Sequence, residues 1–425
     1  EGIVRFTGRP SSPAYSAFLK AQNLSLDGLF LSSAAITLKG DKRAVEIVHS
    51  GLELWKGAGW VKGVIDVEKG KLTLIGGVEG FRFASAARLL GLADAGGTGS
   101  AQFTAGGTLD DPTFNAKFNL KNASLNGGVL ETSSGNAYYR GGGLKLKADV
   151  FKAAAKAGST EIYADFPGKK IKGKVSVEKM PAETLSRMMK LGIEKFVGAG
   201  DVSGSFIISG GFDRPEVSGA FTASNIDTGE FTVKKMTGAL NADKASVSVT
   251  KMKADLAGGG TAEGKLDYLP DKGALAAAVQ FKRAAINSIG FVKKYDSTLK
   301  GEAYGSIEAS GASSAVKISG NVEIRKTQLN GCDPFTMKSD FRYDGKSLNA
   351  ENVSSDAGYE GSFSVEFDKK NALNAVLTAK SARMDPAFAV FGLRAEDVRV
   401  ASAFGTHSSG WPASRRRVGC GCPDC

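Results

Sequence analysis

The sequence predicts a mainly β protein, an elongated, curled and repetitive sheet that forms a groove, with one short amphipathic helix in each repeat of about 100 residues. Three observations support this prediction: apolar and polar residues alternate in many segments, glycine is abundant, and the chain resembles itself at a fixed spacing. The 425 residues include 55 glycines but only 11 prolines. Because no Gly-X-Y period appears, the glycines indicate frequent turns and close backbone packing rather than collagen.

The strand prediction comes from alternation with a period of two. Phe114, Phe118 and Leu120 alternate with polar residues such as Asn115 and Lys117. The same alternation occurs at 144–150, 171–178, 318–325 and 362–368. Strict alternation is typical of a strand with one wet face and one apolar face. We therefore expect a sheet whose apolar face must be shielded from water.

The repeat prediction comes from segments that recur in the same order. A glycine-rich segment, which we interpret as a hinge, is followed by an alternating strand and then by a small polar turn. Hinges occur at 97–107, 198–211 and 301–311, and polar turns at 23–28, 122–127, 225–229 and 327–331. The predicted domains are repeat 1 at 1–96, with its start missing, repeat 2 at 97–197, repeat 3 at 198–300, repeat 4 at 301–400, and an atypical, disordered or non-native tail at 401–425.

One helix is predicted at the end of each repeat. The clearest runs from Pro181 to Val197, with Leu185, Met188 and Ile193 on one face. Pro181 suits a first helical turn and Gly198 suits a stop. Weaker equivalents lie at 83–92, 284–295 and 384–393. An amphipathic helix between runs of strands packs its apolar face onto a sheet.

The repeats leave three architectures open. A one-sided sheet can close into one barrel per repeat, stack as sandwiches, or curl into a continuous trough with its apolar face inward. No Pro/Ser-rich spacer separates the repeats, and contiguous repeats that contact only their neighbours favour the trough. Such a trough either holds something apolar or packs shut, and the sequence leaves both outcomes open.

The sequence lacks the residue sets that catalysis, metals or nucleic acids require. The net charge is +11, but the lysines are spread over alternating positions, without a basic cluster interleaved with aromatics. No P-loop, His-Glu-x-x-His motif or nucleophile elbow appears. The set His407, Cys420, Cys422 and Cys425 has poor metal-ligand spacing. We expect no enzyme, no cofactor, no metal and no nucleic acid partner.

The order of these motifs resembles a known family. An amphipathic helix at 181–197 is followed by a Gly-x-Gly-x-x-x-Gly-Ser segment at 198–205, a strand at 206–209, a Gly-Gly-x-x-x-Pro turn at 210–215 and another strand at 217–223. This order is similar to the repeats of AsmA-like and TamB-like envelope proteins of Gram-negative bacteria. The likeness covers about residues 1–400.

The resemblance implies a function. Such proteins are anchored in the inner membrane by an N-terminal helix, span the periplasm, and carry phospholipid acyl chains in an apolar β-sheet groove between inner and outer membranes. Some are linked to the assembly of outer-membrane proteins. This chain contains no run of about 18 apolar residues, so we expect it to be a middle portion without its anchor. The alternatives are a scaffold for outer-membrane protein assembly and a surface adhesin built of repeated β-domains.

The candidate groove residues are the large apolar side chains at the inward positions of the predicted strands. They are Phe114, Phe118, Leu120, Val175, Val177, Phe206, Ile208, Phe221, Ile318, Val322, Ile324, Phe363, Val365 and Phe367.

Overall fold

The computed structural model describes residues 1–9, 12–26, 29–89, 94–152, 155–188, 199–227, 232–290, 292, 298–312, 315–366 and 373–386. The predicted tail at 401–425 and the candidate Phe367 lie outside these residues. The chain divides into two compact units, one of residues 1–223 with 240–244 and one of residues 224–239 with 245–425.

The described residues are mainly β, and their 24 strands belong to one open antiparallel sheet. The predicted class is therefore confirmed, and the sheet is not a series of closed barrels. The first twelve strands are β1 (Gly2–Arg9), β2 (Ser12–Leu26), β3 (Leu29–Gly40), β4 (Ala44–Leu54), β5 (Gly57–Asp66), β6 (Lys71–Arg82), β7 (Ala95–Gly107), β8 (Pro112–Leu125), β9 (Gly128–Arg140), β10 (Gly143–Lys152), β11 (Ala155–Asp165) and β12 (Lys170–Pro181). The others are β13 (Asp201–Gly211), β14 (Arg214–Asp227), β15 (Thr232–Ala242), β16 (Val247–Leu256), β17 (Thr261–Leu269), β18 (Ala274–Ala285), β19 (Lys300–Ala312), β20 (Ala315–Gln328), β21 (Phe335–Tyr343), β22 (Ser347–Ser355), β23 (Tyr359–Glu366) and β24 (Leu373–Ala379).

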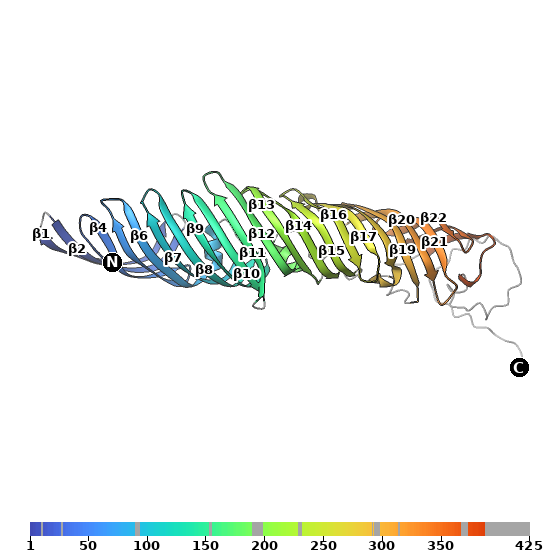
Figure 1. The fold of residues 1–425 in the computed structure, drawn as a ribbon, viewed down its shortest axis with the longest axis horizontal. Helices are drawn as coiled ribbons and strands as arrows, with labels where there is room; N and C mark the ends of the chain where they lie inside the picture. The colour runs from blue at the N-terminus through green and yellow to red at the C-terminus, as the bar shows by residue number, and fades with distance from the viewer. Residues whose placement is uncertain are drawn as a thin grey trace, which may run out of the picture. The chain divides into compact units, whose positions relative to one another are not determined.

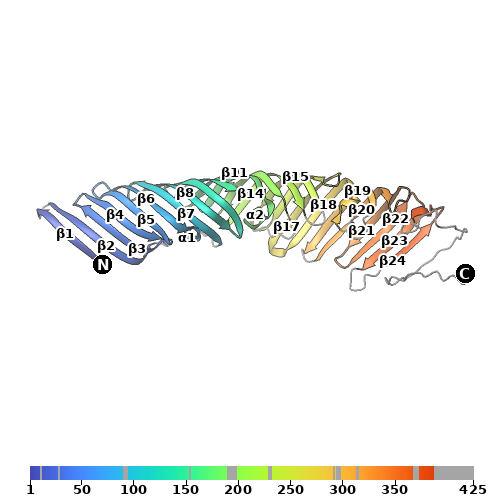
Figure 2. The same cartoon turned by 90° about the horizontal axis from the view of Figure 1, so that it is seen from below.

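Strands that are consecutive in the chain pair with each other in two long stretches of the sheet. In the first unit this meander runs from β1 to β13, and Figure 1 shows these strands in order from blue to green. In the second unit it runs from β16 to β24, and Figure 2 shows its last strands side by side in the same order. Antiparallel neighbours joined by short turns are the simplest way to build a sheet from alternating segments.

In the described part of the first unit, two short α-helices interrupt the meander, and six strands separate them. Helix α1 (Phe83–Leu89) follows β6 and packs on β7, while α2 (Ala182–Met188) follows β12 and packs on β9 and β12. In α2, Glu183 in the first turn pairs with Arg187 in the last turn at 2.6 Å, an i,i+4 pair that also suits the helix dipole.

The other helix predictions fare differently. Within 284–295, Ala284 and Ala285 belong to β18, a 3-10 turn, η2 (Ile286–Ser288), follows, and Gly290 and Val292 are helical. Within 384–393, Asp385 and Pro386 are helical. The rest of 284–295 lies mostly outside the described residues, as do 189–197 and 387–393. One helix per repeat is therefore not confirmed, and the boundaries of the repeats stay predictions.

The predicted hinges and polar turns are parts of strands. The first hinge, residues 97–107, lies within β7, and the polar turn at 122–127 begins inside β8. The chain reverses only at Asn126 and Gly127, whose φ angles are 51° and 82°. Two residues with positive φ form the tight turn that matches the twist of antiparallel strands. The predicted range of 122–127 includes this turn but begins four residues before it, because Asn122 is also a turn-like residue type.

Asn122 instead forms a bulge opposite Gly97. Its φ is 49°, a left-handed conformation that asparagine tolerates better than most residues. The pairing of β7 with β8 shifts register between Gly96 and Thr98 at this point. A Cβ on Gly97 would lie 2.7 Å from the main-chain oxygen of Asn122. The recurring glycine thus leaves room for a bulge in the next strand.

The apolar core is shallow and lies where helix α1 meets the sheet. Val78, Phe81, Leu120 and Ala123 form a buried cluster, and Phe83 of the helix packs against it. Among the described residues no large side chain is fully buried. A two-layer domain of this length would contain many such side chains. Most of the apolar face therefore keeps partial contact with solvent.

Candidate functional site

The candidate groove residues of the first unit lie on one face of the sheet, which we call the apolar face. Directly paired residues in an antiparallel sheet point to the same side. One row of such pairs crosses β6–β13 through Val78, Ala101, Phe118, Gly135, Ala148, Thr160, Val175 and Phe206. The other candidates on these strands lie two or four residues along the strand from a member of this row, so they point to the same face. They are Phe114, Leu120, Val177 and Ile208.

Phe221 joins the same face through its neighbour Gly219. A Cβ on Gly219 would lie 2.8 Å from a ring carbon of Phe206, which places Gly219 on the apolar face. Phe221 is two residues further along β14 and therefore points to the same side. All eight candidates of the first unit are thus on one surface.

The second unit repeats the arrangement within its own strands. A row of pairs crosses β17–β24 through Gly264, Val279, Ile307, Gly320, Phe341, Ala350, Phe363 and Ala375. The remaining candidates lie two or four residues along the strand from Gly320 or Phe363, so they point to the same face. They are Ile318, Val322, Ile324 and Val365. The structure therefore brings these candidates together with Phe363 on one surface of this unit.

Exposure varies across the apolar face of the first unit. Near helix α1, Leu120 is 7% exposed. Phe206, which pairs with Val175 in the row described above, is 5% exposed. At the opposite end of β8, Phe114 is 42% exposed. Phe118 and Val175, between these extremes, are half-buried. The helices cover one margin of the face, and the apolar surface toward the other margin remains accessible.

Glycines on the neighbouring strands make room for the large side chains of this face. A Cβ on Gly76 would lie 2.4 Å from the ring of Phe103, and one on Gly135 would lie 2.7 Å from the ring of Phe118. Each ring thus lies over the glycine of the next strand instead of standing away from the sheet. The result is a smooth apolar surface made by a single layer.

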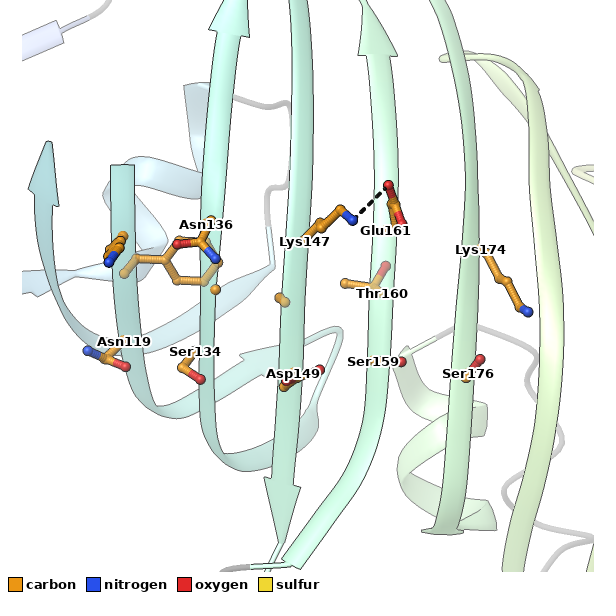
Figure 3. A pocket seen from close by; sticks show the side chains of 14 residues that line it. Asn119, Ser134, Asn136, Lys147, Asp149, Ser159, Thr160, Glu161, Lys174 and Ser176 are labelled. Atoms are coloured by element: carbon orange, nitrogen blue, oxygen red, sulfur yellow. Dashed lines mark ion pairs between the residues drawn. The ribbon is translucent and has the colours of Figure 1, made fainter. Parts of the chain in front are cut away.

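A different surface feature lies on the opposite face, which we call the polar face. A hollow of about 720 Å³ extends over β8–β12. Figure 3 shows two rows of polar side chains across these strands, and the hollow contains both. The upper row is Lys117, Asn136, Lys147, Glu161 and Lys174, and the lower row is Asn119, Ser134, Asp149, Ser159 and Ser176. The hollow is therefore lined mainly by polar side chains, and Phe118, Gly135, Ala148 and Thr160, of the row between these two, complete its lining.

Ion pairs organise the charges of this hollow. Glu161 accepts from Lys145 at 2.9 Å and from Lys147 at 3.3 Å, and Asp149 pairs with Lys156 at 2.7 Å. The hydrogen bonds from the two lysines lower the pKa of Glu161 below its usual value, so this carboxylate stays ionised in mildly acidic solution. Both acidic side chains of the hollow are thus already compensated.

Comparison of the chain with protein-family models, with curated proteins and with solved structures finds no match. The residues themselves therefore carry the functional argument. Within the part of the chain that the structure describes, no three His, Cys, Asp or Glu side chains lie close enough to hold a metal ion. No described helix has both the length and the apolar composition needed to cross a bilayer.

The sequence predicted the apolar face but not the polar hollow. Alternation alone assigns each residue to a face, whereas the hollow depends on which residues of five strands stand beside each other. The turn at Asn126-Gly127 was the available signal. It places Leu125 opposite Gly128, and hence Asn119 opposite Ser134. The next turn, at Gly141 and Gly142, is a second such signal, since both residues have positive φ, whereas residues 153–154 lie outside the described residues.

Proposed function

We propose that the chain is a non-enzymatic lipid carrier whose apolar face forms a curled groove for phospholipid acyl chains. The observation that supports this is an apolar face that continues from strand to strand while no large described side chain is fully buried. Extended apolar surface left uncovered by the protein's own core is typical of a binding surface. Acyl chains suit it because the side chains that line it are almost all hydrocarbon, with few groups that could fix one polar ligand.

The resemblance to AsmA-like and TamB-like proteins supplies the setting of this proposal. In that setting the chain belongs to a periplasmic protein that is anchored in the inner membrane and passes phospholipid toward the outer membrane. The meander supports this reading, since a groove lengthened strand by strand can carry a lipid along many neighbouring positions. No catalytic step is needed.

The proposal is tested by placing a carboxylate on the apolar face. Phe114→Asp is suitable because Phe114 is already 42% exposed, so folding tolerates the change. Asn115→Asp is the matched control, since it adds the same charge at the next residue, on the opposite face. In the second unit Val365→Asp and Ser364→Asp form an equivalent pair. Phospholipid that co-purifies with each variant is measured by mass spectrometry.

We expect the unmodified chain, Asn115→Asp and Ser364→Asp to carry phospholipid, and Phe114→Asp and Val365→Asp to carry much less. Circular dichroism checks that all four variants keep their β content. Lipid-free unmodified protein, or equal lipid in the two members of each pair, would overturn the proposal.

A further inference from the structure

The hollow on the polar face is concave and roomy enough for a ligand. Its volume of about 720 Å³ falls in the range of small-molecule sites in proteins. The lower row of side chains is half-buried at Ser134, Asp149 and Ser159, whereas Lys117, Asn136 and Lys174 of the upper row are exposed. A chain-like molecule can lie along such a recess.

The charge of this surface favours an anion. The outward positions of β8–β12 hold nine basic and four acidic side chains, a net charge of +5. The basic residues are Lys117, Lys121, Arg140, Lys145, Lys147, Lys156, Lys170, Lys172 and Lys174, and the acidic ones are Asp149, Glu161, Asp165 and Glu178.

Two of these lysines flank the hollow. Glu161 and Asp149 are engaged by other lysines, and no ion pair to a described residue is found for Lys117 or Lys174. They stand on β8 and β12, four strand spacings or about 19 Å apart. An anion with charges at separated positions could contact both.

The uncharged side chains between these lysines favour a ligand rich in hydroxyl groups. Asn119, Ser134, Asn136, Ser159 and Ser176 line the recess, and none makes a side-chain hydrogen bond to another described residue. Hydroxyl and amide groups both donate and accept, as the hydroxyls of a sugar do. In the adjoining row Tyr138 and Tyr163 are 39% and 40% exposed. The ring of Tyr138 offers an apolar surface beside the recess, and the Nζ of Lys172 lies 5.1 Å from the centre of the Tyr163 ring.

We propose that the polar hollow binds an acidic polysaccharide, with Lys117 and Lys174 holding its anionic groups and the serine and asparagine side chains holding its hydroxyls. This site is on the face opposite the proposed lipid surface, and its occupancy does not depend on lipid binding.

Titration of the full chain with oligogalacturonate, a carboxylated polysaccharide, tests the proposal by calorimetry. A neutral dextran fragment, polyphosphate and phosphatidylglycerol vesicles serve as comparison probes. The double variant Lys117→Gln/Lys174→Gln removes the flanking charges. The double variant Lys42→Gln/Lys346→Gln removes the same charge from two exposed turns elsewhere and is the matched control.

We expect the Lys117/Lys174 variant to bind oligogalacturonate at least about tenfold more weakly, because two charge-assisted contacts are lost. The control variant should bind as the unmodified chain does, and dextran should bind much more weakly. Equal loss in both lysine variants would show non-specific attraction and overturn the proposal. Equal binding of dextran would overturn it as well.

The hydroxyl contacts need a separate variant, Ser134→Ala/Ser176→Ala, which keeps every charge. It should weaken oligogalacturonate binding while leaving polyphosphate binding unchanged. If oligogalacturonate binds this variant normally, or if the Lys117/Lys174 variant loses only vesicle binding, the ligand is not a polysaccharide in this recess. Because Phe114→Asp removes lipid and leaves this face intact, it should keep full oligogalacturonate affinity.

Discussion

The side-chain amide of Asn126 donates a hydrogen bond of 2.8 Å to the main-chain oxygen of Met188, 62 residues further along the chain. This bond ties the turn between β8 and β9 to the last residue of α2. Carbonyl groups at a helix C-terminus lack partners within the helix, so a side-chain donor satisfies one of them. Asn126 therefore serves both the turn, through its positive φ, and the docking of the helix.

We predict that Asn126→Gly lowers the free energy of unfolding by about 1 kcal/mol, because it removes the hydrogen bond but accepts the positive φ. Asn126→Ala should cost about 1–2 kcal/mol more, since alanine disfavours that conformation. Hydrogen exchange should show faster exchange at α2 in both variants. Unchanged exchange of the α2 amides in Asn126→Gly would contradict the docking role.

Gly135 is predicted to be intolerant of any side chain. In Gly135→Ala the new Cβ would meet the ring of Phe118 and the main-chain oxygen of Lys147, so the variant should lose about 1–3 kcal/mol of stability. Gly51→Ala is the control, because a Cβ there meets nothing within 4 Å. Urea unfolding of the two variants measures the difference. Similar unfolding midpoints would show that the rings do not lie over the glycines.

We predict that replacing Thr160 by valine stabilises the protein. The hydroxyl oxygen of Thr160 is buried without a hydrogen-bond partner in the row between Ala148 and Val175. Thr160→Val keeps the shape and removes the unpaired polar atom, which should raise the free energy of unfolding by about 1 kcal/mol. Thr104→Val, at an exposed position of the polar face, should change little. A loss of stability in Thr160→Val would indicate that the hydroxyl has a partner in solution.

Glu302 should make stability depend on pH. Hydrogen bonds from Lys326 and Tyr304, each 3.1 Å long, together with nearby Arg283, lower the pKa of the Glu302 carboxyl. Because the folded pKa lies below the unfolded one, the stabilisation is complete above the unfolded pKa. It is lost as pH falls through the folded pKa. The melting temperatures of the unmodified chain and Glu302→Gln should differ above about pH 5 and converge near about pH 3. A difference that grew as pH fell would refute this assignment.

The sequence predicts which face of the sheet a residue occupies better than it predicts which residues lie beside it on the neighbouring strands. The alternation from Phe114 to Leu120 is enough to place these residues on one side, because the pleat of a strand imposes it. The role of Gly97 was misread as a hinge, because a glycine that accommodates a bulge looks in sequence like a flexible one. That bulge is a property of two strands together, and residue 122 lies 25 positions away in the chain.

The polar hollow is harder to predict for the same reason. Its two rows combine residues from β8 to β12, and one irregularity of register changes which side chains meet. The shift between Val150 and Phe151 is such an irregularity. Short-range residue patterns describe one strand at a time and contain no information on this shift. Residue types still indicated the character of the surface, since Lys117, Lys147 and Lys174 all occupy outward positions.

The strict order of the meander restricts how a gene for such a protein can change in length. Within β1–β13 every strand is hydrogen-bonded to those before and after it in the chain. Removal of one strand would reverse the direction of all later strands. Helix α2 would then lie at the opposite ends of the strands that it now contacts. Removal of two consecutive strands would restore direction and shorten the first unit by about 10 Å. Viable insertions and deletions should therefore come in even numbers of strands.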